Sequence, residues 1–195
     1  MRVYPVFLRL EDEPVVVVGG GTIAAGKLAG LLAAGARVTV VAPAIAAACR
    51  RPEVTLIERG FAPADLDGAR FVIAAATPAV NREVAAAARA RNLFVNAVDD
   101  PAAASAFLGG VVRRAGVAGD VTIAISTGGE APALAGLLRE ALDAALPADL
   151  DGWLATARAH RDRWRRDGTP IALRRDDLLD ALLAARAAQP EGGPS

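Results

Sequence analysis

Cysteine and aromatic residues are scarce in this 195-residue chain. The single cysteine, Cys49, excludes an intrachain disulfide and argues against a cysteine-based zinc site, since such sites need several ligands. A free thiol suits a reducing compartment, so we expect a cytoplasmic protein. Alanine supplies much of the 53% apolar fraction and aromatics only 4%. We therefore expect a packed core in which helices approach closely through small side chains.

No sign of charge is in excess, since 22 basic residues balance 22 acidic ones. A neutral chain has no net attraction to nucleic acid or anionic lipid, so neither is expected as a partner. Residues 1–10 contain two arginines and a proline and no long apolar core, which predicts no secretory signal. No uninterrupted apolar stretch of about 18 residues suggests a membrane span.

Short apolar runs alternate with helix-forming segments in the first half of the chain. Residues 15–18 are all valine, as is typical of a strand buried on both faces of a parallel sheet. Further strands are expected at 37–41, 54–57, 71–75 and 93–96, and helices at 22–34 and 79–90. Residues 49–68 are too few for a full helix between strands. This alternation predicts an α/β fold with a Rossmann-like, doubly wound parallel sheet.

The second half of the chain is mainly helical in character. Strands are expected at 111–112 and 121–125 with a turn at 116–120, and helices at 133–146, 150–166 and 176–188. We therefore expect a Rossmann domain at 1–112, a dimerisation region at 113–147 and a C-terminal helical region at 148–195. The helix at 133–146 carries an apolar stripe too wide for the Rossmann core to cover, which predicts a homodimer. Its members are Leu134, Leu137, Leu138, Leu142 and Leu146.

The pattern Gly19-x-Gly21-x-x-Ala24 follows the first strand and opens a helix. In dinucleotide-binding folds the first glycine permits a tight turn, and the second lets the backbone approach a pyrophosphate. The small third residue lets the helix pack on the strand, and the helix N-terminus supplies N–H donors. This context favours nucleotide binding over a turn without a ligand.

The second strand lacks the acidic residue that usually binds the ribose in this fold. It ends in Val41-Ala42-Pro43-Ala44, so backbone groups near Pro43 and Ala44 must face the adenosine ribose. The nearest arginines, Arg50 and Arg51, lie beyond an alanine-rich segment. Because no guanidinium is adjacent for a 2′-phosphate, we expect NAD⁺ in preference to NADP⁺.

Two polar clusters follow later strands. Asn96-Ala97-Val98-Asp99-Asp100-Pro101 stands at the carboxyl end of the fifth strand, where open α/β sheets bind ligands. A carboxylate there is placed to act, but Asp99 or Asp100 could equally cap the turn before Pro101. The second cluster, residues 126–132, reads Ser-Thr-Gly-Gly-Glu-Ala-Pro and is either an anion cradle or a capped helix start.

Several of these motifs together resemble the precorrin-2 dehydrogenase domain found in siroheme synthases. Matching features occur in the family's order from about Tyr4 to Leu146. They are Tyr4-Pro5-Val6-Phe7, Gly19-Gly20-Gly21, Gly35-Ala36, Ala74-Ala75-Ala76-Thr77, Asn96-Ala97-Val98-Asp99, and Ile125-Ser126-Thr127-Gly128-Gly129 followed by Ala131-Pro132. Two positions depart from the family, since Gly110 stands where a proline is usual and Thr127 where some members have serine.

The resemblance implies oxidation of precorrin-2, a tetrapyrrole, to sirohydrochlorin with NAD⁺ as hydride acceptor. It implies that Asp99 is the catalytic residue. Some family members also insert Fe²⁺, which leaves that activity open here. The family forms dimers through its helical half. Because 195 residues leave no room for a methyltransferase domain, we expect a separate protein to carry out the methylation that precedes this step. Cofactor contacts are expected at Gly19, Gly21, Thr22, Ile23, Pro43, Ala44 and Thr77.

Other classes stay open on the sequence. A non-catalytic nucleotide-sensing module would use Asp99 only as a turn residue, but such modules normally keep the ribose carboxylate. A different nicotinamide oxidoreductase should offer a His, Lys or Tyr acid beyond the sheet, where Tyr4 and His160 are poorly placed. Residues 158–166 hold five arginines against one aspartate, a net charge of +4. A solvated helix face is favoured there over a clamp for substrate carboxylates, and no metal site is expected at His160.

Overall fold

A computed structural model describes residues 3–187, which divide into two compact units. The first unit extends from residue 3 to Leu108 and includes Ser126–Ala131. The second comprises Gly109–Ile125 and the described residues from Pro132 onward. No helix among the described residues combines the length and the apolar character needed to cross a membrane.

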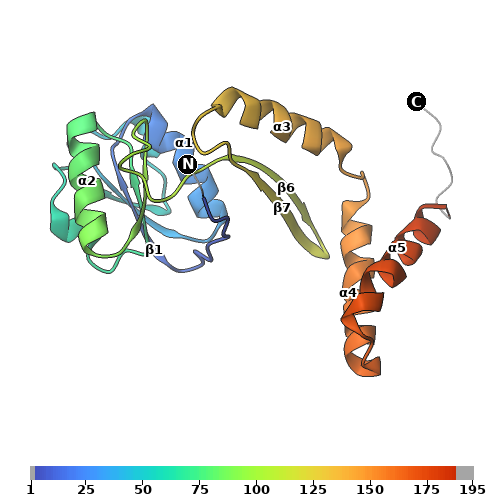
Figure 1. The fold of residues 1–195 in the computed structure, drawn as a ribbon. Coiled ribbons are helices and arrows are strands. Elements are labelled where there is room, and N and C mark those ends of the chain that lie inside the picture. Colours follow the sequence, from blue (N-terminus) through green and yellow to red (C-terminus); the bar gives the residue numbers. More distant parts are fainter. Residues whose placement is uncertain (1–2, 188–195) are drawn as a thin grey trace. The chain divides into compact units, whose positions relative to one another are not determined.

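The first unit is built on five parallel strands in the order β3-β2-β1-β4-β5 (Figure 1). The strands are β1 (Pro14–Val18), β2 (Arg37–Val41), β3 (Val54–Ile57), β4 (Phe71–Ala74) and β5 (Phe94–Ala97). The chain builds outward from β1 to β3 and then returns to the other side of β1. The order therefore reverses between β1 and β4, which is where doubly wound folds bind ligands. The predicted α/β fold is confirmed.

Helices α1 (Thr22–Ala33) and α2 (Pro78–Ala90) lie on opposite faces of this sheet (Figure 1). Side chains alternate along a strand, so β1 supplies both cores. Val17 packs in a cluster with Leu28 of α1, and Val18 packs in a second cluster with Val84 of α2. No α-helix forms between β2 and β4, as the shortness of that segment predicts; besides β3 it contains only the 3₁₀ turns η1 (Ala47–Cys49) and η2 (Pro63–Leu66).

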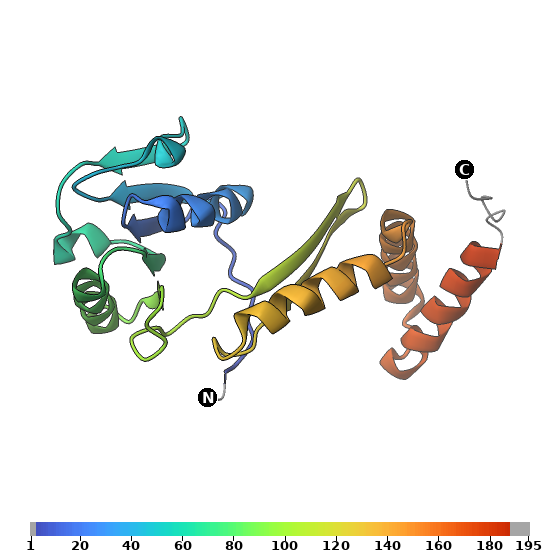
Figure 2. The same cartoon turned by 90° about the horizontal axis from the view of Figure 1, so that it is seen from above.

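The second unit contains an antiparallel hairpin and three helices among its described residues. Figure 2 shows the hairpin beside α3. The elements are β6 (Gly110–Gly116), β7 (Gly119–Ile125), α3 (Pro132–Ala145), α4 (Leu150–Asp167) and α5 (Ile171–Ala187).

The boundaries in this unit that differ most from the sequence prediction are those of β6 and α5. Strand β6 is much longer than the expected 111–112, because Arg113 and Arg114 pair with Thr122 and Val121 of β7. This pairing overrides the weak strand preference of the arginines. Helix α5 begins at Ile171 and not at 176, because the preceding Pro170 provides a backbone preorganised for a helix start. Residue 188 of the predicted helix lies outside the described residues.

Candidate active site

The glycine loop after β1 lies tightly against two neighbouring loops. Gly19 has a φ of +126°, and a Cβ on it would lie 2.2 Å from the carbonyl oxygen of Ala75. A Cβ on Gly20 would lie 2.3 Å from the carbonyl oxygen of Ala44. Any side chain at either position would displace backbone, so the loop requires glycine there. Gly21 differs, because a Cβ on it would meet nothing within 4 Å.

Open space at Gly21 coincides with the start of α1. Gly21 is the N-cap residue and offers no side-chain hydrogen bond to the helix, and the first turn contains no acidic residue. The N–H groups of the first turn have no acceptor within the helix, and Thr22 and Ile23 are exposed. Outward N–H donors and the positive end of the helix dipole fit a pyrophosphate.

Cys49 contacts the carbonyl groups of this loop and thereby orients its peptide groups. The sequence did not indicate this role. Its Sγ lies 3.6 Å from the carbonyl oxygens of both Gly20 and Gly21. Burial raises the pKa of the Cys49 thiol, and the opposing effect of Arg51 is smaller, so the thiol stays protonated and donates. The N–H and C=O of a trans peptide point in opposite directions. The N–H groups of Gly21 and Thr22 therefore point away from Cys49.

In the segment after β2, only backbone groups are available to bind the ribose of a cofactor. Pro43 and Ala44 are exposed, and no carboxylate follows the strand. The guanidinium of Arg50 is held at 2.9 Å by Glu58, which leaves it less free for a phosphate. Thr77 is exposed at the start of α2, where its Oγ1 accepts a hydrogen bond from the Val80 N–H at 3.5 Å. These residues, with the glycine loop, fit a dinucleotide without a 2′-phosphate.

Asp99 lies on the turn directly after β5. Val98 still donates its N–H to the Ala74 carbonyl at 2.9 Å, so Asp99 is the first residue past the edge of the sheet. It is exposed with a φ of +59°, and within residues 3–187 its carboxylate has no hydrogen-bond partner. Asp100 instead accepts from the Ala103 N–H at 3.1 Å. The turn role thus belongs to Asp100, and the Asp99 carboxylate is available for a ligand.

The hydroxyls of residues 126–131 are used locally. Ser126 Oγ accepts from the Gly128 N–H at 3.1 Å, and Thr127 Oγ1 accepts from the Ala131 N–H at 3.2 Å. Both hydroxyls therefore accept hydrogen bonds from the segment's own backbone N–H groups, which favours a local turn before α3 over an anion cradle. A Cβ on Gly129 would lie 3.8 Å from Cγ of Pro101, so this segment adjoins the turn that carries Asp99.

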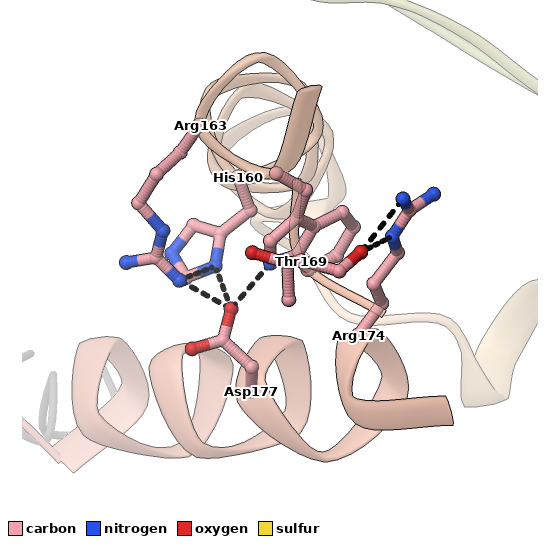
Figure 3. A network of polar contacts seen from close by, with 6 residues as sticks. His160, Arg163, Thr169, Arg174 and Asp177 are labelled. Atoms are coloured by element: carbon pink, nitrogen blue, oxygen red, sulfur yellow. Dashed lines mark hydrogen bonds and ion pairs between the residues drawn. The ribbon is translucent and has the colours of Figure 1, made fainter. Parts of the chain in front are cut away.

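Some polar side chains of the arginine-rich helix α4 bind α5 (Figure 3). The carboxylate of Asp177 accepts from Trp164 Nε1 at 2.6 Å and from Arg163, and lies 3.1 Å from His160 Nδ1. The pKa of Asp177 is lowered to about 2. The hydrogen bond from Trp164 has the largest effect on this pKa, and the one from Arg163 has the next largest. No group of three potential metal ligands occurs in the described part of the chain. The remaining arginines are exposed, namely Arg158, Arg161, Arg165 and Arg166.

Two family models match the chain. Residues 6–110, more than half of it, match the family described as "Putative NAD(P)-binding". Residues 119–145 match the family described as "Sirohaem biosynthesis protein central". The first match spans the glycine loop and Asp99, and the second spans all of β7 and α3.

Curated relatives carry the name siroheme synthase. That of Methylobacillus flagellatus is 40% identical over 167 residues, which are 83% of this chain and 35% of the relative. Siroheme synthase 1 of Aeromonas salmonicida is 38% identical over 194 residues, which are 97% of this chain and 41% of the relative. The chain therefore spans well under half the length of these relatives.

A solved structure, that of SirC, a precorrin-2 dehydrogenase, has the same fold. It superimposes with a TM-score of 0.67 over 91% of this chain and 88% of that chain, at 24% identity. The two consecutive family matches cover both the sheet and the region after it. The chain belongs to the siroheme synthase family, and its residues 6–110 belong to the family described as "Putative NAD(P)-binding".

Proposed function

We propose that the chain oxidises precorrin-2 to sirohydrochlorin with NAD⁺. The observation that carries the proposal is the available carboxylate of Asp99 at the same edge of the sheet as the glycine loop. The names of the similar proteins support the tetrapyrrole substrate, and the family description supports the dinucleotide. A cytoplasmic location is part of the proposal and is tested by fractionating cells that express the chain.

The chain's own residues have separable tasks in this reaction. NAD⁺, when bound, accepts a hydride from the reduced macrocycle, which also loses a proton. The N–H groups of Gly21 and Thr22 bind the pyrophosphate, and the backbone at Pro43 and Ala44 faces the ribose. The Asp99 carboxylate accepts the proton or stabilises positive charge that develops on the macrocycle.

The test is incubation of the full chain with precorrin-2 and NAD⁺ while NADH absorbance is followed. We expect NADH to accumulate together with the sirohydrochlorin spectrum, and neither to form without NAD⁺. Binding of NAD⁺ without turnover would instead identify a non-catalytic NAD-sensing module. Adding Fe²⁺ to the completed reaction tests iron insertion, for which Asp99 is the carboxylate available to take pyrrole N–H protons.

The second unit supports a homodimer as part of the proposal. Among its described hydrophobic residues only Val112, Ala135 and Trp164 are buried. Leu137 on α3 is 64% exposed, and Leu134, Leu138 and Leu142 on the same stripe are also exposed. A domain with so small a core needs another protein surface to cover its apolar side chains. A second copy of the chain can supply that surface, because the two copies of a symmetric dimer present the same patch to each other.

The dimer is tested by the molar mass in solution, measured by light scattering at micromolar concentration. We expect twice the mass of the chain for the parent and the monomer mass for Leu137→Glu. Ala90→Glu is the control, because Ala90 is exposed at the end of α2 in the first unit. A monomeric parent would refute the homodimer.

A further inference from the structure

Asn81 joins two loops at the carboxyl edge of the sheet. It lies one turn into α2 and is only 4% exposed. Its Oδ1 accepts a hydrogen bond from the Ala76 N–H at 2.9 Å, and its Nδ2 donates to the Val98 carbonyl at 3.3 Å. Ala76 follows β4, and Val98 directly precedes Asp99. One side-chain amide therefore links the loop after β4 to the turn after β5.

The loop after β4 is also in contact with the glycine loop. A Cβ on Gly19 would lie 2.2 Å from the Ala75 carbonyl oxygen and 3.1 Å from the Ala76 nitrogen. Contacts thus run without a break from the glycine loop through Ala76 and Asn81 to the residue before Asp99. This path connects the proposed cofactor cradle to the proposed catalytic carboxylate.

We propose that Asn81 is a positioning residue that fixes the Asp99 carboxylate relative to the glycine loop. The inference rests on the proposed dehydrogenase function and adds a residue that touches neither cofactor nor substrate. Asp99 has no side-chain partner among the described residues, so the position of its backbone sets which places its carboxylate can reach. Asn81 anchors that backbone through Val98. An error of about 1 Å in such a position can lower turnover about 10²-fold.

The substitution Asn81→Asp tests this role through its dependence on pH. An ionised carboxylate cannot donate to the Val98 carbonyl, whereas a protonated one both donates to Val98 and accepts from Ala76. Burial raises the pKa of a carboxyl group, so the protonated form should return at mildly acidic pH. We expect kcat about 10- to 100-fold below the parent at neutral pH. The ratio of variant to parent kcat should recover as the pH falls.

Other ionisable groups near Asn81 are common to both proteins. Asp99 and Asp100 lie on the turn that it contacts, and Arg82 and Glu83 follow it on α2. Strands β4 and β5 contain no ionisable side chain. Because parent and variant share these groups, the ratio of their kcat values isolates the substituted residue. The Kd for NAD⁺ should change little, since the glycine loop keeps its own contacts.

Asn96→Asp is the matched control. Asn96 is also buried, at 8% exposed, and donates its Nδ2 to a backbone carbonyl, that of Ala106, at 3.0 Å. Its side chain is bonded to neither Ala76 nor Val98 in the described structure. We expect Asn96→Asp to lose about as much thermal stability as Asn81→Asp, but we do not expect its kcat relative to the parent to recover at acidic pH. Should Asn81→Asp fail to fold, Asn81→Ala removes both bonds and should lower kcat at every pH.

A second readout needs no turnover. In the cofactor-free protein, the NMR amide shifts of Ala76 and Val98 should titrate with one shared inflection in Asn81→Asp that the parent lacks. A folded variant whose kcat ratio does not change with pH would overturn the positioning role. A parent that does not turn over would overturn the proposed function instead. The amide titration would then decide separately whether Asn81 bridges the two loops, and independent inflections would refute the bridge.

Discussion

Replacing Gly19 and Gly21 separately with alanine should separate folding from cofactor binding within one loop. At Gly19 the new Cβ would lie 2.2 Å from the Ala75 carbonyl oxygen, and the φ of +126° is strained for any L side chain. Such backbone strain costs about 1–3 kcal/mol, and the clash adds to it because backbone must move. We expect a loss of at least about 2 kcal/mol, which lowers Tm by about 4–8 °C.

Gly21→Ala should show the reverse behaviour. Its Cβ meets nothing within 4 Å and its φ is −89°, so the fold accepts it. The stability cost is at most about 1 kcal/mol, because glycine is the better N-cap residue. The methyl group enters the space proposed for the pyrophosphate, however. A lost or lengthened phosphate contact of about 1.4 kcal/mol raises the Kd for NAD⁺ about tenfold.

Gly26→Ala is the control for both substitutions. Gly26 is exposed within α1, and a Cβ there meets nothing within 4 Å. Alanine should therefore stabilise the helix by up to about 1 kcal/mol and leave NAD⁺ binding unchanged. Thermal unfolding and calorimetric titration with NAD⁺ measure the two effects. Parent-like stability of Gly19→Ala, or parent-like NAD⁺ binding by Gly21→Ala, would refute the reasoning for that position.

Three further predictions concern catalysis, pH and cofactor choice. Asp99→Asn should lower kcat for precorrin-2 about 10²–10⁴-fold with NAD⁺ binding retained, whereas Asp100→Asn should cost much less; parent-like turnover of Asp99→Asn would remove the carboxylate from the mechanism. The pKa of Asp177 is about 2 in the folded chain against an ordinary 3.8, so its stabilisation is complete above the ordinary value and is lost as pH falls to about 2. Acid titration of helical circular dichroism should show this loss, and Asp177→Asn should be less stable than the parent at neutral pH but not near pH 2. The kcat/KM for NAD⁺ should exceed that for NADP⁺ at least about tenfold, the effect of about 1.4 kcal/mol; equal values would contradict the cofactor assignment.

Local patterns in the sequence were enough for the sheet and the glycine loop. The valine run at 15–18 and the later β-branched runs identify buried parallel strands, because both faces of such a strand are apolar. The glycine spacing after the first strand predicts the tight turn, which the φ of Gly19 shows. The family resemblance drew on motifs that each lie within a few consecutive residues.

Other features depend on residues that are distant in the chain. Strand β6 is long only because β7 pairs with it, and the sequence of β6 alone predicts two residues. The sequence favours a turn role for Asp100 over Asp99, because Asp100 precedes Pro101 and is biased toward an extended backbone. Only the folded turn shows the partner, the Ala103 N–H, which Asp100 accepts from.

Asn81 shows the same limit most clearly. It lies on the buried face of α2 with Val84, Ala85 and Ala88. A polar residue on that apolar face was the only sign in the sequence that Asn81 has a specific partner. What it binds is decided by the sheet, which brings Ala76 and Val98 together at the ends of adjacent parallel strands. The sequence by itself thus determined which elements form, because strand and helix periodicity are local. Only the tertiary structure decided which polar groups meet, because a hydrogen bond depends on distance in space.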